Sequence, residues 1–197
     1  MCCIADIRKG IKGSFEMKSY EITSAAALAA ISASLQLVHI GVSVSYIWID
    51  LVAIPWIVAF FLYGGRSALV VSLVAALLII LFTPFGLIGG PIKWVATLPM
   101  WLLPWIWHRA SGMKLADFRK VRVLAIWVIL AVLIRGAIIL PADYYVAFPL
   151  VGVSPAQAMS ILPWWLLFGL NVIQGALEVI VAWLLVFRFR LDRFAAW

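Results

Sequence analysis

Long apolar segments, separated by short polar ones, run along almost the whole chain. A helix needs about 20 predominantly apolar residues to cross the hydrocarbon core of a bilayer. Six windows have or approach this character: Ile22–Val42, Ile47–Tyr63, Ser67–Phe82, Ile92–Trp107, Val123–Leu140 and Leu162–Phe187. The pattern therefore predicts an all-α membrane protein, a bundle of six transmembrane helices.

The second and third windows are short, and Tyr63-Gly64-Gly65-Arg66 joins them. This sequence fits either a tight turn between two helices or a break within a single helix. We favour two helices, because the two windows together cover about 35 residues, which is too long for one span.

The composition excludes a water-soluble globule. Hydrophobic residues make up 66% of the 197 residues and charged residues only 12%, and the mean hydropathy is +1.15. Such a chain has too few polar residues to cover its surface in water. We therefore expect lipid to be its solvent.

The distribution of positive charge predicts the orientation. The net charge is +7, and 13 of the 15 Lys and Arg residues fall in the termini or in alternate connections. The other set of connections holds Lys93, Asp50 and Asp143. This positive-inside pattern predicts a multi-pass protein of the cell membrane with both termini in the cytoplasm. A nucleic-acid partner is not needed to explain the charge.

We expect one domain. Residues 1–20 form a cytoplasmic N-terminal tail, and residues 21–197 form the six-helix transmembrane domain. Cys2 and Cys3 lie in the tail, where disulfides are disfavoured, so we expect them to be inert apart from lipidation. The predicted outer connections Gly41–Asp50, Thr83–Pro91 and Pro141–Ile161 have a composition typical of lids over a pocket.

The last window carries Asn171, Gln174 and Glu178 on one face, with Gly175 beside them. Polar groups inside lipid are costly and usually face a cavity or a partner, and the missing side chain of Gly175 would leave room for a ligand. Asn171 and Gln174 are therefore candidate ligand-binding residues, although bonds to neighbouring helices would also explain them. For Glu178 we expect a structural role or a partner contact.

Arg135 and Asn171 lie about 9–14 Å below the predicted outer surface, at 1.5 Å per helical residue, so they could share a pocket. Asp50, Lys93 and Asp143 stand just above that level. An outward-opening cavity would then have charges of both signs at its mouth. A structural ion pair, such as Arg135 with Asp143, is the alternative.

Aromatic residues are a further candidate feature. Of the 11 tryptophans, Trp94, Trp101 and Trp105 repeat along one stripe of the fourth window. Most tryptophans of such a chain anchor helices at the interface or pack against lipid; a platform for a planar ligand is the alternative reading of Trp94 and Trp101. Similar candidates in the outer connections are Tyr46, Trp48, Tyr144 and Tyr145.

The first window contains a ladder of small residues, Ala25, Ala29 and Ala33, with a second row beside it at Ala26, Ala30 and Ser34. Small residues let helices approach closely in lipid. The ladder fits packing within the protein's own bundle, and it also fits docking of another membrane subunit.

We find no catalytic set, since His39 and His108 are isolated and no cluster has metal-ligand spacing. The chain also lacks a P-loop and cannot hydrolyse ATP itself. We expect no enzyme activity, no metal and no cofactor.

Five segments in order carry a family resemblance: the ladder Ala25-x-x-x-Ala29-x-x-x-Ala33, Ile49-Asp50-Leu51-Val52-Ala53-Ile54-Pro55, Tyr63-Gly64-Gly65, Ala142-Asp143-Tyr144-Tyr145 with Phe148-Pro149-Leu150, and Asn171-Val172-Ile173-Gln174-Gly175. Together they resemble the S components of energy-coupling factor (ECF) transporters, and specifically the riboflavin-type branch. The resemblance implies a six-helix subunit that binds a vitamin from outside, docks through the alanine ladder on a transmembrane coupling subunit driven by two ATPase subunits, and topples in the membrane.

Two positions depart from the riboflavin-type pattern. Members of that branch commonly have Asn at the position of Asp143 and Lys at the position of Gln174, and both residues contribute to their ligand pocket. The first change introduces a negative charge near the substrate, and the second removes a positive one.

Our first hypothesis is therefore a substrate-binding subunit for a vitamin or related heterocycle, with riboflavin or a relative as the leading candidate. The candidate substrate-binding residues are Asn171, Gln174, Asp143, Tyr144, Lys93, Arg135, Asp50 and Trp94. A membrane assembly or scaffold protein is the second hypothesis, and an intramembrane enzyme the third.

Overall fold

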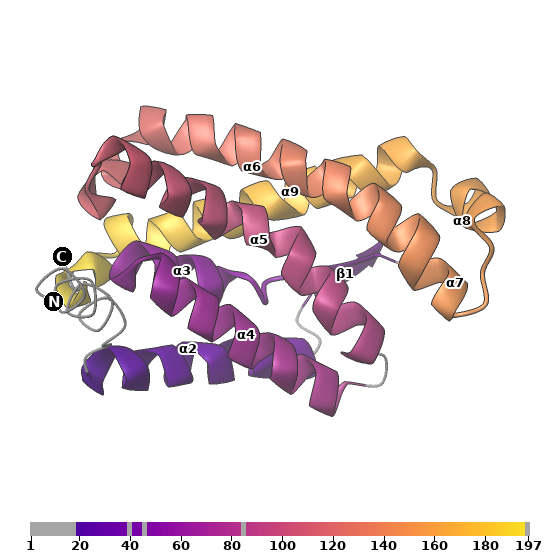
Figure 1. Ribbon diagram of the computed structural model, residues 1–197, viewed down its shortest axis with the longest axis horizontal. Helices are drawn as coiled ribbons and strands as arrows, with labels where there is room; N and C mark the ends of the chain where they lie inside the picture. The colour runs from indigo at the N-terminus through magenta and orange to yellow at the C-terminus, as the bar shows by residue number, and fades with distance from the viewer. Residues whose placement is uncertain (1–18, 39–40, 45–46, 84–85, 196–197) are drawn as a thin grey trace, which may run out of the picture.

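The computed structural model describes residues 19–38, 41–44, 47–83 and 86–195, and this part of the chain is mostly helical (Figure 1). The longer helices are α2 (Ser19–Leu37), α3 (Ile54–Tyr63), α4 (Gly65–Phe82), α5 (Gly86–Ser111), α6 (Val121–Ala142) and α9 (Trp164–Trp183). Two short strands, β1 (Gly41–Val44) and β2 (Ile47–Asp50), separate α2 from α3. The shorter helical pieces are the 3-10 turns η1 (Leu115–Arg119) and η4 (Leu191–Phe194), the π turns η2 (Asp143–Ala147) and η3 (Leu184–Arg188), and the helices α7 (Phe148–Leu150) and α8 (Pro155–Ile161).

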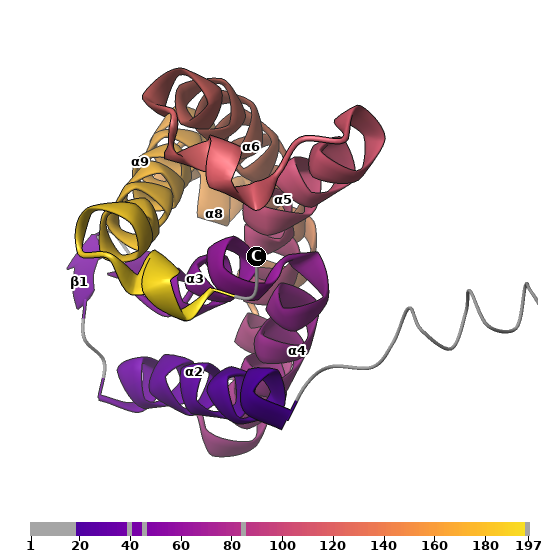
Figure 2. The same ribbon diagram turned by 90° about the vertical axis from the view of Figure 1, so that its left-hand side faces the viewer.

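Helix α3 lies in the middle of the bundle. Seen end-on, the helices α2, α4, α5, α6 and α9 surround it (Figure 2). Every residue from Ile54 to Leu62 is buried, as expected for a helix that is hydrophobic all round. Its 10 residues give a length of about 15 Å, half of the hydrocarbon thickness. Helix α3 therefore forms the core of the bundle.

The structure corrects the second predicted window, Ile47–Tyr63. Strand β2 pairs antiparallel with β1, with Gly41 opposite Asp50 and Val44 opposite Ile47, and the helix begins only at Ile54. Isoleucine and tryptophan favour strands, and a proline in the first turn of α3 fits a helix start. The expected outer loop Gly41–Asp50 is thus a hairpin.

The turn between α3 and α4 confirms two separate helices. Gly64 has φ +87°, a conformation that costs little only for glycine. At Gly65, a Cβ would come within 2.1 Å of the Trp105 ring. One glycine therefore sets the direction of the chain, and the next permits close packing of α4 on α5.

The fifth predicted helix continues beyond its expected end at Leu140. Helix α6, η2 and α7 form one apolar helical segment from Val121 to Leu150, and α8 follows at Pro155. The expected outer connection Pro141–Ile161 is therefore mostly helical. Pro141 lies inside α6 and does not end the helix.

The connection between α5 and α6 is stabilised by hydrogen bonds among its own charged residues and by a buried phenylalanine. Asp117 accepts hydrogen bonds from the Lys120 ammonium at 2.9 Å and from the Lys114 N–H at 3.0 Å. The hydrogen bond from Lys120 lowers the pKa of the Asp117 carboxyl. Phe118 is buried, and its carbonyl accepts a 3.0 Å hydrogen bond from the Trp183 indole.

Three segments of the described chain are long and apolar enough to cross a membrane: Gly65–Phe82, Val121–Leu150 and Trp164–Arg188. Large apolar side chains on their outer faces are exposed, such as Leu81 at 72% and Ile126 at 65%. Such exposure fits a lipid solvent. The chain is a membrane protein with transmembrane helices, and the expected six spans and cytoplasmic termini stay predictions.

Candidate functional site

A chain of buried polar side chains crosses the centre of the bundle. One end of it is the ion pair between the ammonium of Lys93 on α5 and the carboxylate of Asp50 at the end of β2. The Asp50 side chain is only 4% exposed and that of Lys93 is 16% exposed. Two candidate site residues from different elements thus meet, and their charges compensate.

The end of β2 is tied to two further helices. The Asp50 carboxylate also accepts a 3.0 Å hydrogen bond from the Val52 N–H, and the Asp50 carbonyl accepts one of 3.4 Å from the Gln174 amide on α9. The Ser32 hydroxyl of α2 donates to the Val52 carbonyl and accepts from the Trp56 indole, both at 2.7 Å. The hairpin exit is therefore a junction of α2, α5 and α9.

The other end of the polar chain is the ion pair of Arg135 on α6 with Glu178 on α9, at 2.5 Å. Gln174 donates a 3.0 Å hydrogen bond to the other carboxylate oxygen of Glu178. These two residues of α9 lie one turn apart, so they present their side chains to the same face. All three side chains are buried, and Arg135 pairs with Glu178 where Asp143 was the suggested alternative.

Asn171 lies one turn outward on α9 and is 6% exposed. Its amide donates a 3.0 Å hydrogen bond to the Leu167 carbonyl of its own helix. Asn171 thus shares the buried face with Gln174 and Glu178, as the sequence pattern predicted.

The sequence predicts room for a ligand at Gly175, but neighbouring side chains occupy this space. A Cβ at this position would lie 2.7 Å from the Met100 methyl, 3.2 Å from Arg135 Cδ and 3.2 Å from Val132 Cγ1. Side chains of α5 and α6 therefore fill this space. The glycine permits close packing of three helices in this structure.

Asp143 and Tyr144 lie further out, in the π turn η2. The Tyr144 ring is buried and stacks on Phe148 with ring centroids 6.1 Å apart, and its hydroxyl donates to the Leu162 carbonyl at 2.5 Å. Asp143 is about 12 Å from Arg135 along the helix, at 1.5 Å per residue. Tyr145 points away and is 65% exposed.

The tryptophan stripe of α5 faces α4. The Trp94 indole donates a 3.1 Å hydrogen bond to the Ser72 hydroxyl, Trp101 is buried, and Trp105 packs on Gly65. The stripe therefore makes contacts inside the protein. Tyr46 lies outside the described residues, and so does the side chain of Trp48.

The alanine ladder of α2 is buried. Ala25, Ala29 and Ala33 are 2%, 1% and 8% exposed, and the first two pack in a cluster with residues of α3 and α4, among them Trp56, Val71 and Ala75. The second row, Ala26, Ala30 and Ser34, is exposed. In this structure the ladder packs within the protein's own bundle, and docking through it would require α2 to separate from α3 and α4.

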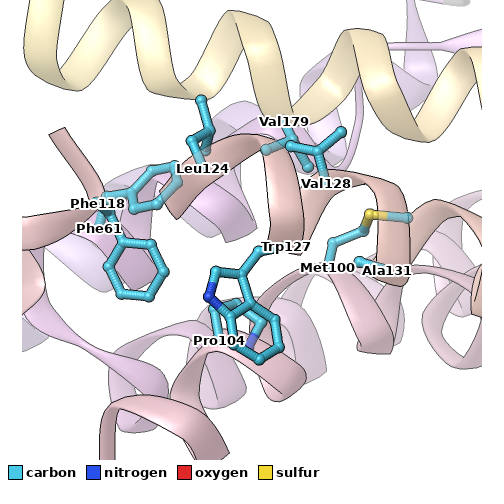
Figure 3. Close-up of a pocket in the computed structure, with 9 residues that line it drawn as sticks. All are labelled: Phe61, Met100, Pro104, Phe118, Leu124, Trp127, Val128, Ala131 and Val179. Carbon is cyan, nitrogen blue, oxygen red and sulfur yellow. The ribbon is translucent and has the colours of Figure 1, made fainter. Parts of the chain in front are cut away.

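An apolar pocket lies between α3, α5, α6 and α9, with Phe118 of η1 at one end (Figure 3). It is small, with a cavity volume of about 10 Å³, and Met100 and Ala131 line one end while Phe61 and Phe118 line the other. The remaining lining residues are Pro104, Leu124, Trp127, Val128 and Val179. Met100 thus borders both the pocket and the space over Gly175.

Sequence reasoning missed several residues of this region. Ser32 lies among the small residues of α2, where its hydroxyl had no visible partner, and Thr97 and Met100 follow Lys93 on the inner face of α5. The one available signal was the spacing of Lys93 and Thr97, which are a helical turn apart.

Comparison with known proteins reveals the fold. No protein-family model and no curated protein matches the chain. A solved structure described as "Structure and mechanism of the S component of a bacterial ECF transporter" is similar, with a TM-score of 0.70 and 20% sequence identity. The alignment covers 88% of this chain and 96% of that chain. The chain has the fold of an ECF S component.

Proposed function

We propose that this chain is the substrate-binding membrane subunit of an ECF-type importer for a vitamin or a related small molecule. The observation that carries the proposal is the polar chain from Lys93 and Asp50 to Glu178, buried in a bundle with the S-component fold. Polar groups within a membrane are costly and mark substrate paths more often than anchors. A small polar molecule is therefore the ligand that fits this interior best.

Lys93, Asp50, Gln174 and Asn171 are the proposed polar contacts of the substrate, with Arg135 beneath them. Tyr144 and Trp94 already donate their polar hydrogens to Leu162 and Ser72, so their proposed contribution is the face of the ring. Asp143 is the proposed contact at the outer end.

Riboflavin or a relative is the proposed substrate, on the strength of the sequence resemblance to the riboflavin-type branch. Gln174 stands where that branch commonly has Lys, and its amide contacts Asp50 and Glu178. A lysine there could donate to the same two oxygens, the Asp50 backbone carbonyl and the Glu178 carboxylate. The substitution Gln174→Lys should therefore be tolerated.

The proposed partners are a transmembrane coupling subunit and two ATPase subunits. Helix α2 is the proposed docking element, through Ala25, Ala29 and Ala33 if α2 moves, or through the exposed row at Ala26, Ala30 and Ser34 if it does not. Six spans with both termini in the cytoplasm complete the proposal.

Mass spectrometry of small molecules retained by the purified protein tests this function. We expect one tightly bound heterocycle, released on denaturation and taken up by vesicles that contain this chain with the coupling and ATPase subunits. A protein that retains nothing and supports no uptake, yet binds other membrane subunits, would be a scaffold.

A further inference from the structure

Buried hydrogen-bond donors around Met100 lack partners in the part of the chain that the structure describes. They are the hydroxyl of Thr97, the Nε of Arg135 and the indole Nε1 of Trp101, in residues that are 0%, 2% and 1% exposed. A buried polar group without a partner costs free energy, and native proteins keep few of them. A ligand that accepts hydrogen bonds would remove this cost.

The helical positions of α5 direct Thr97 toward the bundle centre. Successive residues are 100° apart, so Thr97 lies between Met100 on one flank and Trp94 on the other. Met100 reaches toward Gly175 of α9, and Trp94 reaches Ser72 of α4. Thr97 therefore faces the middle of the bundle, one turn inward of Lys93.

Met100 lies one helical turn from Thr97 on α5, and its end reaches the space beside Arg135. Its methyl and Arg135 Cδ both lie within 3.2 Å of the Cβ position that Gly175 lacks. Arg135 Nε is bonded to that Cδ, so it lies beside the Met100 side chain. Met100 also lines the apolar pocket on its inner side (Figure 3), and an unbranched thioether side chain changes rotamer readily.

The buried charges around this position are already compensated. Lys93 pairs with Asp50 and Arg135 with Glu178, and each carboxylate oxygen of Glu178 accepts a hydrogen bond, one from Arg135 and one from Gln174. A charged ligand would leave a net charge in a buried site, which is strongly unfavourable. The free groups are donors, so an uncharged acceptor fits them.

Resting on the proposed function, we propose that Met100 is a movable cover over a donor site formed by Thr97 and Arg135 Nε. When Met100 turns away from Gly175, the site takes an uncharged ligand that carries carbonyl or ring-nitrogen acceptors. This inference adds Thr97 and Met100 to the substrate-contacting residues and assigns the charge class of the substrate.

The ligand class is tested with five probes whose binding is followed by the thermal shift of the purified protein. Riboflavin and nicotinamide are uncharged, thiamine is a cation, and flavin mononucleotide and biotin are anions. We expect a shift from an uncharged probe and none from the charged ones. A shift from a charged probe alone, or from none of the five, overturns this inference. Uptake of a charged molecule would still leave the importer proposal standing.

The role of Thr97 is tested by Thr97→Val, with the probe that gives the largest shift. Without ligand, the melting temperature should rise, because an isosteric apolar group replaces an unpaired hydroxyl. With ligand, affinity should fall about tenfold, and Thr97→Ser should keep the affinity of the wild type. Thr83→Val is the matched control, since the Thr83 hydroxyl is bonded to the Ile79 carbonyl. Unchanged affinity in Thr97→Val overturns the donor site.

The cover is tested by Met100→Ala, which removes the side chain that must move. Binding should become several-fold tighter, because the ligand no longer has to select a minor conformation. Weaker binding by a folded Met100→Ala protein would show that Met100 supports the ligand instead of covering its site.

Discussion

At the residue scale, the pair of Arg135 and Glu178 is the most demanding feature of the interior. The two side chains are 3% and 0% exposed and lie 2.5 Å apart. Each charge is tolerated only because the other is present, since an isolated buried charge is strongly unfavourable.

We therefore expect Glu178→Ala to destabilise the protein by about 3–5 kcal/mol, because Arg135 would be left buried without its partner. The measurement is thermal unfolding in detergent, followed by size-exclusion chromatography of the heated sample. The double variant Arg135→Met with Glu178→Leu should recover most of the loss. Equal instability of the single and double variants would show that the pair is not the source of the effect.

Gly175 supports a second prediction at this scale. Gly175→Ala should destabilise the protein by about 1–3 kcal/mol, because its Cβ would displace the Met100 methyl and overpack against Arg135 Cδ and Val132 Cγ1, both 3.2 Å away. Gly169→Ala is the control on the same helix, since a Cβ there has nothing within 4 Å, and alanine favours a helix over glycine by about 1 kcal/mol. If both variants unfold at the same temperature, the space over Gly175 is not filled.

The sequence could predict which residues of α9 share a face, because helical spacing places Asn171, Gln174 and Glu178 together. It could not predict the partners. Asp143 is a candidate partner of Arg135 only if the helix ends at Leu140; because the helix continues to Leu150, Asp143 lies about 12 Å away along it, and Arg135 pairs with Glu178. The filled space over Gly175 was equally hidden, since it depends on Met100 from a third helix.

At the element scale, α2 presents two rows of small residues to different surroundings. Ala29 is 1% exposed and packs in the cluster with α3 and α4, whereas Ala30 is exposed. The sequence predicts both rows but does not decide which one faces the bundle, because the rows have nearly the same composition.

The docking proposal predicts different outcomes for the two rows. Ala30→Trp should leave stability within about 0.5 kcal/mol of the wild type and preserve ligand binding, yet block uptake by holding a partner helix away. Ala29→Trp should instead destabilise the fold by at least about 1–3 kcal/mol through overpacking. Uptake assays in vesicles and thermal unfolding separate the two effects. Normal uptake by Ala30→Trp would exclude this row as a docking face.

Helices and turns were predictable where one sequence feature, such as a glycine pair, was decisive. They were less predictable where hydropathy and residue preference pointed to different structures. The turn at Gly64 and Gly65 was predicted because glycine marks it clearly. The hairpin was missed because Ile47-Trp48-Ile49 is apolar enough to read as the start of a helix, and hydropathy does not separate strand from helix over a few residues. The segment after Leu140 was read as a loop because of Pro141, which the structure accommodates inside α6.

At the scale of the whole molecule, the two ends of the bundle differ in charge. Arg109, Lys114, Arg119, Lys120 and Arg122 lie at or near the connection between α5 and α6, and Arg188, Arg190 and Arg193 lie near the C-terminus. Both groups lie at one end of the bundle, and α7 and α8 lie at the other (Figure 1). A cationic end prefers the cytoplasmic side of a membrane.

This asymmetry predicts the topology, which single-cysteine labelling can test. With Cys2 and Cys3 replaced by serine, a cysteine at Ala156 in α8 should react with a membrane-impermeant maleimide added to intact cells, because Ala156 is exposed at the end opposite the cationic one. Ser111→Cys, at the exposed end of α5, should react only after the membrane is opened. Labelling of Ser111→Cys but not Ala156→Cys in intact cells would show that the protein has the opposite orientation. The proposed site would then open toward the cytoplasm, and capture of a substrate from outside would be excluded.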